Sequence, residues 1–395
     1  MTTTRRIIKA KAAVTLDPDL GSIENAVLIA GGDPPRLLAV GSGPSALKGE
    51  SGPIQDLGEA VLAPGLVNAH VHAANVRFRG RLLMGRGLPA WIESMLPHLA
   101  EPPDPETMAD ALTGMRRSGV ALAADMSDRD GLFLTKAAAS ADGPEMLYAV
   151  QHFGFAPPED GLPDPEHMRR MREIAPPGSV IPSGHALYST HPEAMRLAHA
   201  WCREHGRSFF MHLAESPEET RLLADGGGEL ADLFWRWGVL PQDFAPPGLT
   251  PTAYAHDLGL LGPGTVAVHC VQLDDADLDL IARSGAVVCL CPRSNAAIGV
   301  GRARFEDLHQ AGAPLCLGTD GPGSAPDLSI WSELLFLMQN ARVELGLEQW
   351  LSIASRNGAE ALGMGRDYGR LAPGWRAEWS VVPEKILELA GNNLR

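Results

Sequence analysis

Short apolar runs that each stop at a histidine or a carboxylate recur along this chain of 395 residues. The first such run ends in two histidines, His70 and His72. Side chains two residues apart on a strand leave the same face, so these two imidazoles can reach one ion. Later runs end at His212, His269 and Asp320. The chain therefore needs a fold that gathers the ends of several buried strands at one point.

Strand-like and helix-like segments alternate through the middle of the chain. Candidate strands cover residues 61–70, 119–126, 145–152, 178–186, 207–213, 265–271, 285–291 and 314–319. Helical segments between them include residues 105–117, 192–205 and 274–284. This alternation, over roughly 250 residues, is typical of a (β/α)8 TIM barrel in the α/β class. A doubly wound sheet is the alternative, but it would not bring the first, fifth, sixth and eighth strand ends together, whereas the carboxyl face of a closed barrel does.

The two ends of the chain have the character of short strands separated by turns. Strand candidates between Gly, Pro and Asp residues lie at residues 12–16, 26–30 and 37–40. Residues 369–382 show the same pattern of turn and strand. We expect the two ends to pair in a small composite β-sandwich domain, with residues 1–63 and 368–395 forming this domain and residues 64–367 forming the barrel.

Charge and composition disfavour several classes of partner. The chain has 48 acidic and 33 basic residues, a formal net charge of -15. This balance argues against nucleic acid and anionic membranes as partners, since both select basic surfaces. No apolar segment approaches the length that crosses a bilayer, and residues 1–9 lack the long apolar region of a signal peptide. We expect a small-molecule substrate.

The cysteines indicate a reducing compartment. There are five, an odd number with no paired framework. Four lie in or beside apolar strand-like runs, namely Cys270, Cys289, Cys291 and Cys316. A thiol in such a run usually behaves as a small hydrophobe, which suits the cytoplasm. We therefore expect a cytoplasmic protein, and the sequence leaves open whether it forms a homo-oligomer.

Histidine and carboxylate at the strand ends are the nitrogen and oxygen ligands that zinc and similar divalent ions accept. A single histidine at a strand end is more often a satisfied polar group than a ligand. The conjunction of several such ends in one chain favours a metal site instead. Zinc is the expected ion, although iron or manganese fits the same ligand types.

Four short motifs lie at the candidate strand ends: Pro64-Gly-Leu-Val-Asn-Ala-His-Val-His72, His212-Leu-Ala-Glu215, Val268-His-Cys270 and Gly318-Thr-Asp-Gly321. Together they resemble the amidohydrolase superfamily, in its deaminase and chlorohydrolase branch, over nearly the whole chain. Within this branch, Cys291-Pro-Arg-Ser-Asn295 resembles aminodeoxyfutalosine deaminases. His185-Ala-Leu-Tyr-Ser-Thr190 is similar to deaminases of S-adenosylhomocysteine and methylthioadenosine.

The resemblance implies roles for individual residues. It implies metal ligation by His70, His72, His212 and Asp320. It implies catalytic roles for Glu215, His269 and Asp320. Members with two metal ions usually bridge them with a carboxylated lysine from the fourth strand. The fourth candidate strand here, residues 178–186, contains no lysine, so we expect a single metal ion.

The residues also indicate the type of reaction. Neutral imidazoles leave a bound ion electropositive, which lowers the pKa of a water molecule on it. Glu215 can carry a proton to a ring nitrogen and then to a departing amine. We therefore expect hydrolytic deamination of an amino-substituted heterocycle, first of all an adenine-type nucleoside. The alternatives on the same scaffold are a triazine-type chlorohydrolase or amidohydrolase and a cytosine or guanine deaminase. Retained Glu215 argues against pure dechlorination, because chloride needs no proton to leave. A non-catalytic binding protein is a further rival.

Further residues lie where loops at the carboxyl face of a barrel would build a substrate pocket. The predicted substrate contacts are Arg79, Trp91, His152, His185 and Asn295. Trp91 could equally pack against a helix, and Arg79 could pair with an acidic neighbour. His185 is the stronger candidate because it ends a predicted barrel strand.

Overall fold

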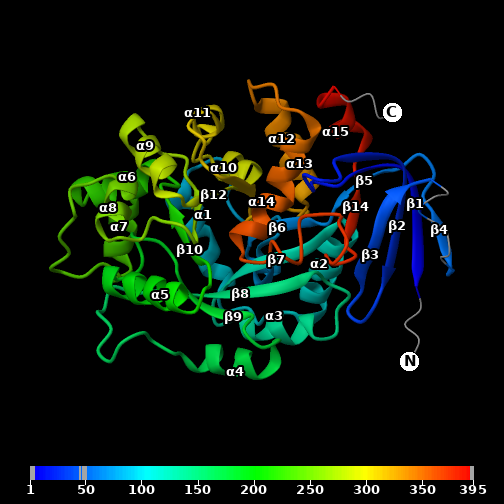
Figure 1. The fold of residues 1–395 in the computed structure, drawn as a ribbon. Coiled ribbons are helices and arrows are strands. Elements are labelled where there is room, and N and C mark those ends of the chain that lie inside the picture. Colours follow the sequence, from blue (N-terminus) through cyan, green and yellow to red (C-terminus); the bar gives the residue numbers. More distant parts are fainter. Residues whose placement is uncertain (1–4, 44–45, 47–50, 392–395) are drawn as a thin grey trace.

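Eight parallel strands in two four-stranded sheets form the centre of the computed structural model, which describes residues 5–43, 46 and 51–391 (Figure 1). The first sheet contains β6 (Leu66–Val71), β7 (Val120–Ser127), β8 (Glu145–His152) and β9 (Val180–Gly184). The second contains β10 (Phe209–Leu213), β11 (Thr265–His269), β12 (Val287–Leu290) and β13 (Leu315–Leu317). Parallel bridges from Val71 to Asp320 and from Ala186 to His212 join the sheets at both seams. The predicted (β/α)8 barrel is confirmed.

Each of the eight predicted strand segments overlaps an observed barrel strand. The first segment, residues 61–70, is split at Gly65 into β5 (Val61–Pro64) and β6. A Cβ atom at Gly65 would lie 2.5 Å from the Cβ of Ala121 and 3.1 Å from the Cβ of Glu378. Glycine is therefore needed here, because the chain passes close to both neighbours as it leaves one sheet and enters the other.

The helices that follow the strands cover the outside of the barrel (Figure 1). The predicted segments form α2 (Pro105–Arg117), α5 (Pro192–Glu204) and α9 (Asp275–Ser284). Side chains cap these helices at their first turns; for example, Asp274 and Asp277 form a capping box at the start of α9. The other helices are η2 (Ala73–Phe78), α1 (Leu88–Met95), η3 (Leu96–His98), α3 (Gly131–Ala138), α4 (Glu166–Ile174), α6 (Pro217–Asp225), α7 (Glu229–Arg236), α8 (Pro251–Asp257), α10 (Pro292–Ile298), α11 (Phe305–Gln310), α12 (Ile330–Asn340), α13 (Leu347–Ala354), α14 (Arg356–Ala361) and α15 (Glu384–Leu389).

The two ends of the chain meet in a separate sheet beside the barrel, on the right in Figure 1. Its strands are β1 (Arg6–Val14), β2 (Ser22–Gly31), β3 (Arg36–Ser42), β4 (Ile54–Asp56), β5 and β14 (Trp379–Val381). Because β14 pairs antiparallel with β5, the predicted pairing of the two ends is confirmed. Within the described residues these strands form one six-stranded sheet rather than two facing sheets. The exact domain division stays a prediction, and residues 1–4, 44–45, 47–50 and 392–395 of it lie outside the described residues.

Alternation along the barrel strands sends one set of side chains inward and the other toward the helices. On β10, Phe210 belongs to the inner cluster, which also contains Val268 and Cys316. Its neighbours Phe209 and Met211 pack in the outer cluster beneath the helices. His212 is two residues beyond Phe210, so it shares the inward face and reaches the carboxyl end of the barrel interior.

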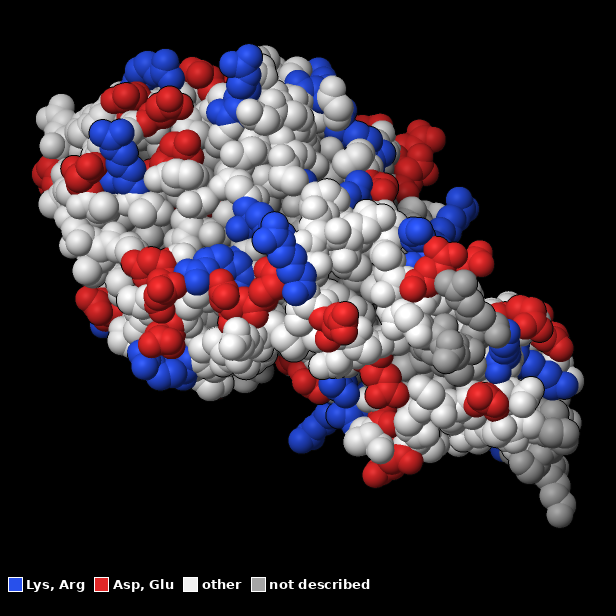
Figure 2. All heavy atoms as spheres, turned by 90° about the horizontal axis from the view of Figure 1, so that it is seen from above, with Lys and Arg blue, Asp and Glu red and all other residues white. Residues whose placement is uncertain are grey.

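Acidic and basic side chains are interspersed on the face of the molecule in Figure 2. All five cysteines are free and buried. In the described part of the chain, none of the helices combines the length and the apolar character that a bilayer crossing requires.

Candidate active site

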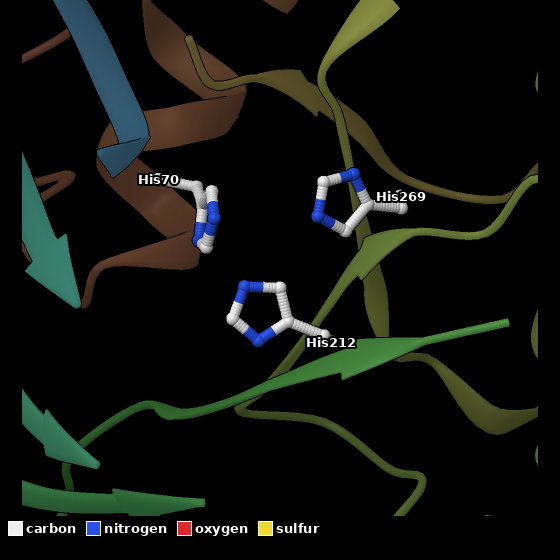
Figure 3. A group of neighbouring side chains, drawn as sticks. All are labelled: His70, His212 and His269. Atoms are coloured by element: carbon white, nitrogen blue, oxygen red, sulfur yellow. The ribbon is translucent and has the colours of Figure 1, made fainter. Parts of the chain in front are cut away.

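Four histidines and one aspartate from four strand ends converge at the carboxyl end of the barrel. His70 and His72 come from the end of β6, His212 from β10, His269 from β11, and Asp320 from the loop after β13. Figure 3 shows the rings of His70, His212 and His269 around a common space. All predicted metal ligands are therefore brought together, and His269 lies among them.

Distances within this cluster suit a single cation. Nε2 of His72 is 3.3 Å from Nε2 of His212. Oδ1 of Asp320 is 3.7 Å from Nε2 of His70 and 3.6 Å from Nε2 of His72. Two overlapping groups have potential ligand atoms within 4.8 Å of one another: His70, His212 and His269, and His70, His72 and Asp320. A divalent ion bound by nitrogen and oxygen atoms fits this arrangement.

The protonation states of these groups also suit a cation. Burial lowers the pKa of His70 to about 3 and holds that of His212 well below its ordinary value. Both imidazoles are therefore neutral near pH 7, which is the form that binds metals. Burial opposes ionisation of Asp320, but the facing His70 and His72 keep its pKa well below the usual range. Both ring nitrogens of His70 are buried without a hydrogen-bond partner among the described residues, which a bound metal would explain.

The backbone at the strand ends is held in an unusual conformation. His269 has a φ of 75° and Asp320 a φ of 59°, and the neighbouring Ala214 and Cys270 also have positive φ values. Each such residue costs on the order of 1–3 kcal/mol and is retained where the surrounding structure requires it. Here the left-handed conformation occurs at His269 and Asp320, whose side chains face the site.

Asp320 is oriented by two serine hydroxyls. Oγ of Ser294 donates to Oδ2 of Asp320 at 2.6 Å, and Oγ of Ser324 donates to the same oxygen at 3.1 Å. Oδ2 is thereby occupied, while Oδ1 faces His70 and His72. Sequence reasoning missed both serines, although Ser294 stands in the quoted motif that ends at Asn295.

The side chain of Asn295 contacts His269 and lies outside the lining of the cavity that opens over the cluster. Its Oδ1 is 2.9 Å from Nδ1 of His269, so the ring donates from Nδ1 and leaves Nε2 as an acceptor. Nε2 of His269 is 3.7 Å from Oε1 of Glu215. Asn295 is absent from the lining of that cavity, and its contact with substrate stays a prediction.

Glu215 is buried beside the cluster in a position that favours its protonated form. Burial, followed by the charge of Asp320, raises the pKa of Glu215 to about 8. Its backbone N–H donates to Oε2 of Glu219 at 2.7 Å, and the N–H of Ala214 donates to Oε1 at 3.2 Å. Glu219 was not predicted, although Ser216-Pro-Glu-Glu219 has the sequence of a capping box. Its carboxyl group therefore fixes the turn that carries Glu215.

A cavity of about 560 Å³ opens over this cluster. Its inner lining includes His72, His212, Glu215, His269 and Asp320. Two of the predicted substrate contacts, Trp91 and His185, also line it. Burial lowers the pKa of His185 to about 3, so its imidazole is neutral.

Two other predicted substrate contacts lie outside this cavity. Arg79 is exposed, and Arg77, two residues earlier in η2, lines the cavity in its place. His152 lines an adjoining cavity of about 480 Å³, which shares Gln151 and Phe153 with the first. His152 ends β8 as expected, but its side chain leaves the opposite side of the strand from Gln151.

Comparison with known proteins agrees with this geometry. The model of the amidohydrolase family matches residues 61–393, and the chain belongs to this family. It is therefore a hydrolase that acts on carbon–nitrogen bonds.

Individual relatives lie in the same branch. The chain is 30% identical over 348 residues to a 5-methylthioadenosine/S-adenosylhomocysteine deaminase of Syntrophobacter fumaroxidans, covering 83% of this chain and 73% of the relative. The aminofutalosine deaminase of Helicobacter pylori, solved with methylthio-coformycin, has a TM-score of 0.80 at 19% identity, covering 98% of this chain and 95% of that one. An atrazine chlorohydrolase of Arthrobacter aurescens, solved with zinc, has a TM-score of 0.75 at 18% identity, covering 98% and 91%. The two solved structures share the fold.

Proposed function

We propose that this protein is a metal-dependent deaminase that hydrolyses an amino-substituted heterocycle, first of all an adenine-type nucleoside, and releases ammonia. The observation that carries this proposal is the position of Glu215. Its carboxyl group is buried at the base of the cavity, 3.7 Å from His269, and its raised pKa of about 8 keeps it protonated near pH 7. An amine leaves a ring only with a proton, so a buried carboxylic acid at this point suits deamination.

The proposed cofactor is one divalent ion, with zinc as the first candidate and iron or manganese as alternatives. His70, His72, His212 and Asp320 would hold it, and the unpartnered ring nitrogens of His70 support this assignment. When bound, such an ion would lower the pKa of a water molecule and favour its attack on the ring. The zinc described for the related atrazine chlorohydrolase supports zinc here.

The side chains of this chain supply the proton transfers. Oδ1 of Asp320 faces the histidines and can accept a proton from the attacking water, while Nε2 of His269 can orient that water. Glu215 donates a proton to a ring nitrogen as the new C–O bond forms. The proton of the new hydroxyl group then passes through Glu215 to the amino group, the C–N bond breaks, and ammonia leaves behind a ring carbonyl. The proton that Asp320 accepted from the water finally restores the acid form of Glu215.

The names of relatives support a nucleoside substrate. The relative from Syntrophobacter fumaroxidans is named for deamination of methylthioadenosine and S-adenosylhomocysteine. Another, from Methanosarcina mazei, is named 5'-deoxyadenosine deaminase. The buried state of all five cysteines further supports our inference of a cytoplasmic enzyme.

The second candidate function is that of a triazine-type chlorohydrolase or of a cytosine or guanine deaminase. The atrazine chlorohydrolase neighbour favours the first of these by its fold. Loss of chloride needs no proton donor, so the buried Glu215 would then have no evident use. We therefore rank this candidate second.

A substrate panel tests the proposal. Protein reconstituted with zinc is incubated with adenosine derivatives, aminopurines, cytosine, guanine and chlorinated aminotriazines, and ammonia and chloride are measured. We expect ammonia from the adenosine derivatives. Chloride release without ammonia, or ammonia from cytosine or guanine alone, would overturn the proposal in favour of the alternatives.

Elemental analysis tests the proposed cofactor. We expect about one equivalent of a divalent metal for each chain, because the described fourth strand β9 contains no lysine that could bridge two ions. Two equivalents that are both required for activity would contradict the single-ion site.

A further inference from the structure

The cavity changes character from its base to its mouth. At the base lie the buried groups Glu215 and His212, both no more than 5% exposed. Farther out, α1 presents one apolar face, because Leu88, Trp91, Ile92 and Met95 follow the i, i+3, i+4, i+7 spacing of a helical stripe and all line the cavity. The outer cavity is therefore walled largely by apolar side chains.

Large apolar side chains remain exposed at the mouth. Leu96, Leu99, Phe153 and Val239 line the cavity and are between 40% and 56% exposed. Phe234 and Trp237, three residues apart at the end of α7, complete the wall. Contiguous exposed apolar surface at a cavity is a mark of a binding site, because an apolar ligand would remove it from water.

Among the described residues, the same lining offers no cationic side chain that lacks an acidic partner. Among the described residues that line the cavity there is one arginine, Arg77, and no lysine. Nη1 of Arg77 is 2.6 Å from Oδ2 of Asp130, and both side chains are buried. The lining also contains the carboxyl groups of Asp128, Glu215 and Asp320. A carboxylate on the ligand would therefore lose water without gaining a counter-charge.

Two buried donors in the lining suit an uncharged acceptor. Nε1 of Trp91 and Nε2 of Gln151 have no hydrogen-bond partner within the described residues. Both residues line the cavity. A buried N–H group without a partner is costly, and an ether, hydroxyl or ring acceptor on the ligand would satisfy it.

Resting on the proposed function, we propose that the outer cavity is an apolar subsite that selects heterocycles carrying an uncharged, apolar substituent over those carrying an ionic one. For an adenine-type nucleoside, the preferred substituent at the 5' position is an alkylthio or arylthio group. The amino acid tail of a homocysteine substituent is disfavoured.

Three substrates test this selectivity on the zinc-loaded enzyme: adenosine, a 5'-alkylthio derivative and S-adenosylhomocysteine. We expect kcat/KM for the alkylthio compound to exceed that for S-adenosylhomocysteine by about tenfold or more. Equal values, or a preference for S-adenosylhomocysteine, would overturn the inference while leaving the deaminase proposal intact. Absence of ammonia from all three would instead count against the proposed function.

Two variants locate the selectivity in the outer cavity. Trp237→Ala should lower kcat/KM for the alkylthio compound several-fold more than for adenosine, mainly through KM. The matched control is Trp235→Ala, since Trp235 lies on the same helix, is 46% exposed and does not line the cavity. Equal effects of the two changes would contradict the subsite.

A third variant, Leu99→Arg, tests the selectivity at a position where a substitution should not disturb folding, because Leu99 is 40% exposed at the mouth of the cavity. The new cation should raise kcat/KM for S-adenosylhomocysteine relative to the alkylthio compound. An unchanged ratio, in a variant whose thermal unfolding matches that of the parent, would contradict the inference.

Discussion

Asn295 accepts a hydrogen bond from Nδ1 of His269 at 2.9 Å, and it lies outside the lining of the active-site cavity. This bond selects the tautomer in which Nε2 of His269 is an acceptor facing Glu215. Ser294, the residue before Asn295, donates a hydrogen bond to Oδ2 of Asp320 and so orients that carboxylate. One short segment at the start of α10 therefore orients two of the proposed catalytic groups.

Asn295→Ala should lower kcat by about 10–100-fold with little change in KM, because the variant frees the His269 ring without touching the substrate. Steady-state kinetics on the best nucleoside substrate would measure this split. Asn340→Ala, at an exposed position on α12, is the control. A raised KM with unchanged kcat would instead support the prediction that Asn295 contacts substrate.

At the scale of elements, the seam between β6 and β13 positions the ligands. Two hydrogen bonds join Asn68 and Thr319 across it: Nδ2 of Asn68 donates to Oγ1 of Thr319 at 2.8 Å, and the backbone N–H of Thr319 donates to Oδ1 of Asn68 at 3.1 Å. The N–H of Asp320 donates to the carbonyl of His70 at 3.1 Å. Two ligands far apart in sequence are thus tied together by backbone.

Gly318→Ala should disturb this seam. A Cβ atom at Gly318 would lie 2.6 Å from the Cβ of His70 and 2.8 Å from its carbonyl oxygen, so the backbone must shift. We expect a loss of about 1–3 kcal/mol in the free energy of unfolding, together with reduced metal content. Urea unfolding and elemental analysis would measure both.

Gly262→Ala is the matched control, because nothing lies within 4 Å of a Cβ at Gly262. If Gly318→Ala kept full stability and full metal content, the close packing of this seam would not be needed to hold His70.

The strand ends were predictable from sequence because their signal is local. An apolar run followed by histidine marks a buried strand and its last residue, and the barrel brings such ends together. The hydrogen bond that Asn295 accepts from His269 joins residues 26 positions apart, so no local sequence pattern predicts it. Arg77 rather than Arg79 lines the cavity because residues 73–78 form the 3-10 helix η2, which includes Arg77, whereas Arg79 follows its end. This short helix was not predicted from the sequence.

The pairing of the two chain ends was likewise predictable in outline only. Turn and strand signals identified β-forming segments, but the register and the number of layers depend on contacts between β5 and β14. These strands are separated by the whole barrel, and neither carries a sequence signal for its partner.

At the scale of the whole molecule, buried titratable groups should shape stability in the metal-free protein. Burial lowers the pKa of seven histidines below the ordinary 6.5: to about 3 for His70 and His185, to about 4 for His152, and also for His167, His199, His212 and His269. The unfolded chain then binds more protons than the folded one below pH 6.5, so each histidine lowers stability as pH falls through this range. Burial raises the pKa of Glu215, Glu219 and Glu333 to about 8, so each of these lowers stability as pH rises from 4.5 to 8.

The free energy of unfolding of the metal-free protein should therefore be highest near pH 6.5, with each group contributing about 1.4 kcal/mol per pH unit within its window. Between pH 4.5 and 6.5 the seven histidines outweigh the three glutamates. Urea unfolding at pH 5, 6.5 and 8 would measure the maximum. A flat profile, or a stability that rises continuously toward pH 8, would contradict the burial of these groups.

The central claim is that Glu215 transfers protons during deamination without holding the metal. The most direct measurement is ammonia release by Glu215→Gln at a metal content equal to that of the parent, with Glu218→Gln, outside the cavity lining, as the control. We predict that Glu215→Gln lowers kcat at least about 100-fold, the size of a lost general acid–base group, while elemental analysis finds the same metal and Glu218→Gln keeps activity. Ammonia release at the parental rate by Glu215→Gln would contradict the account.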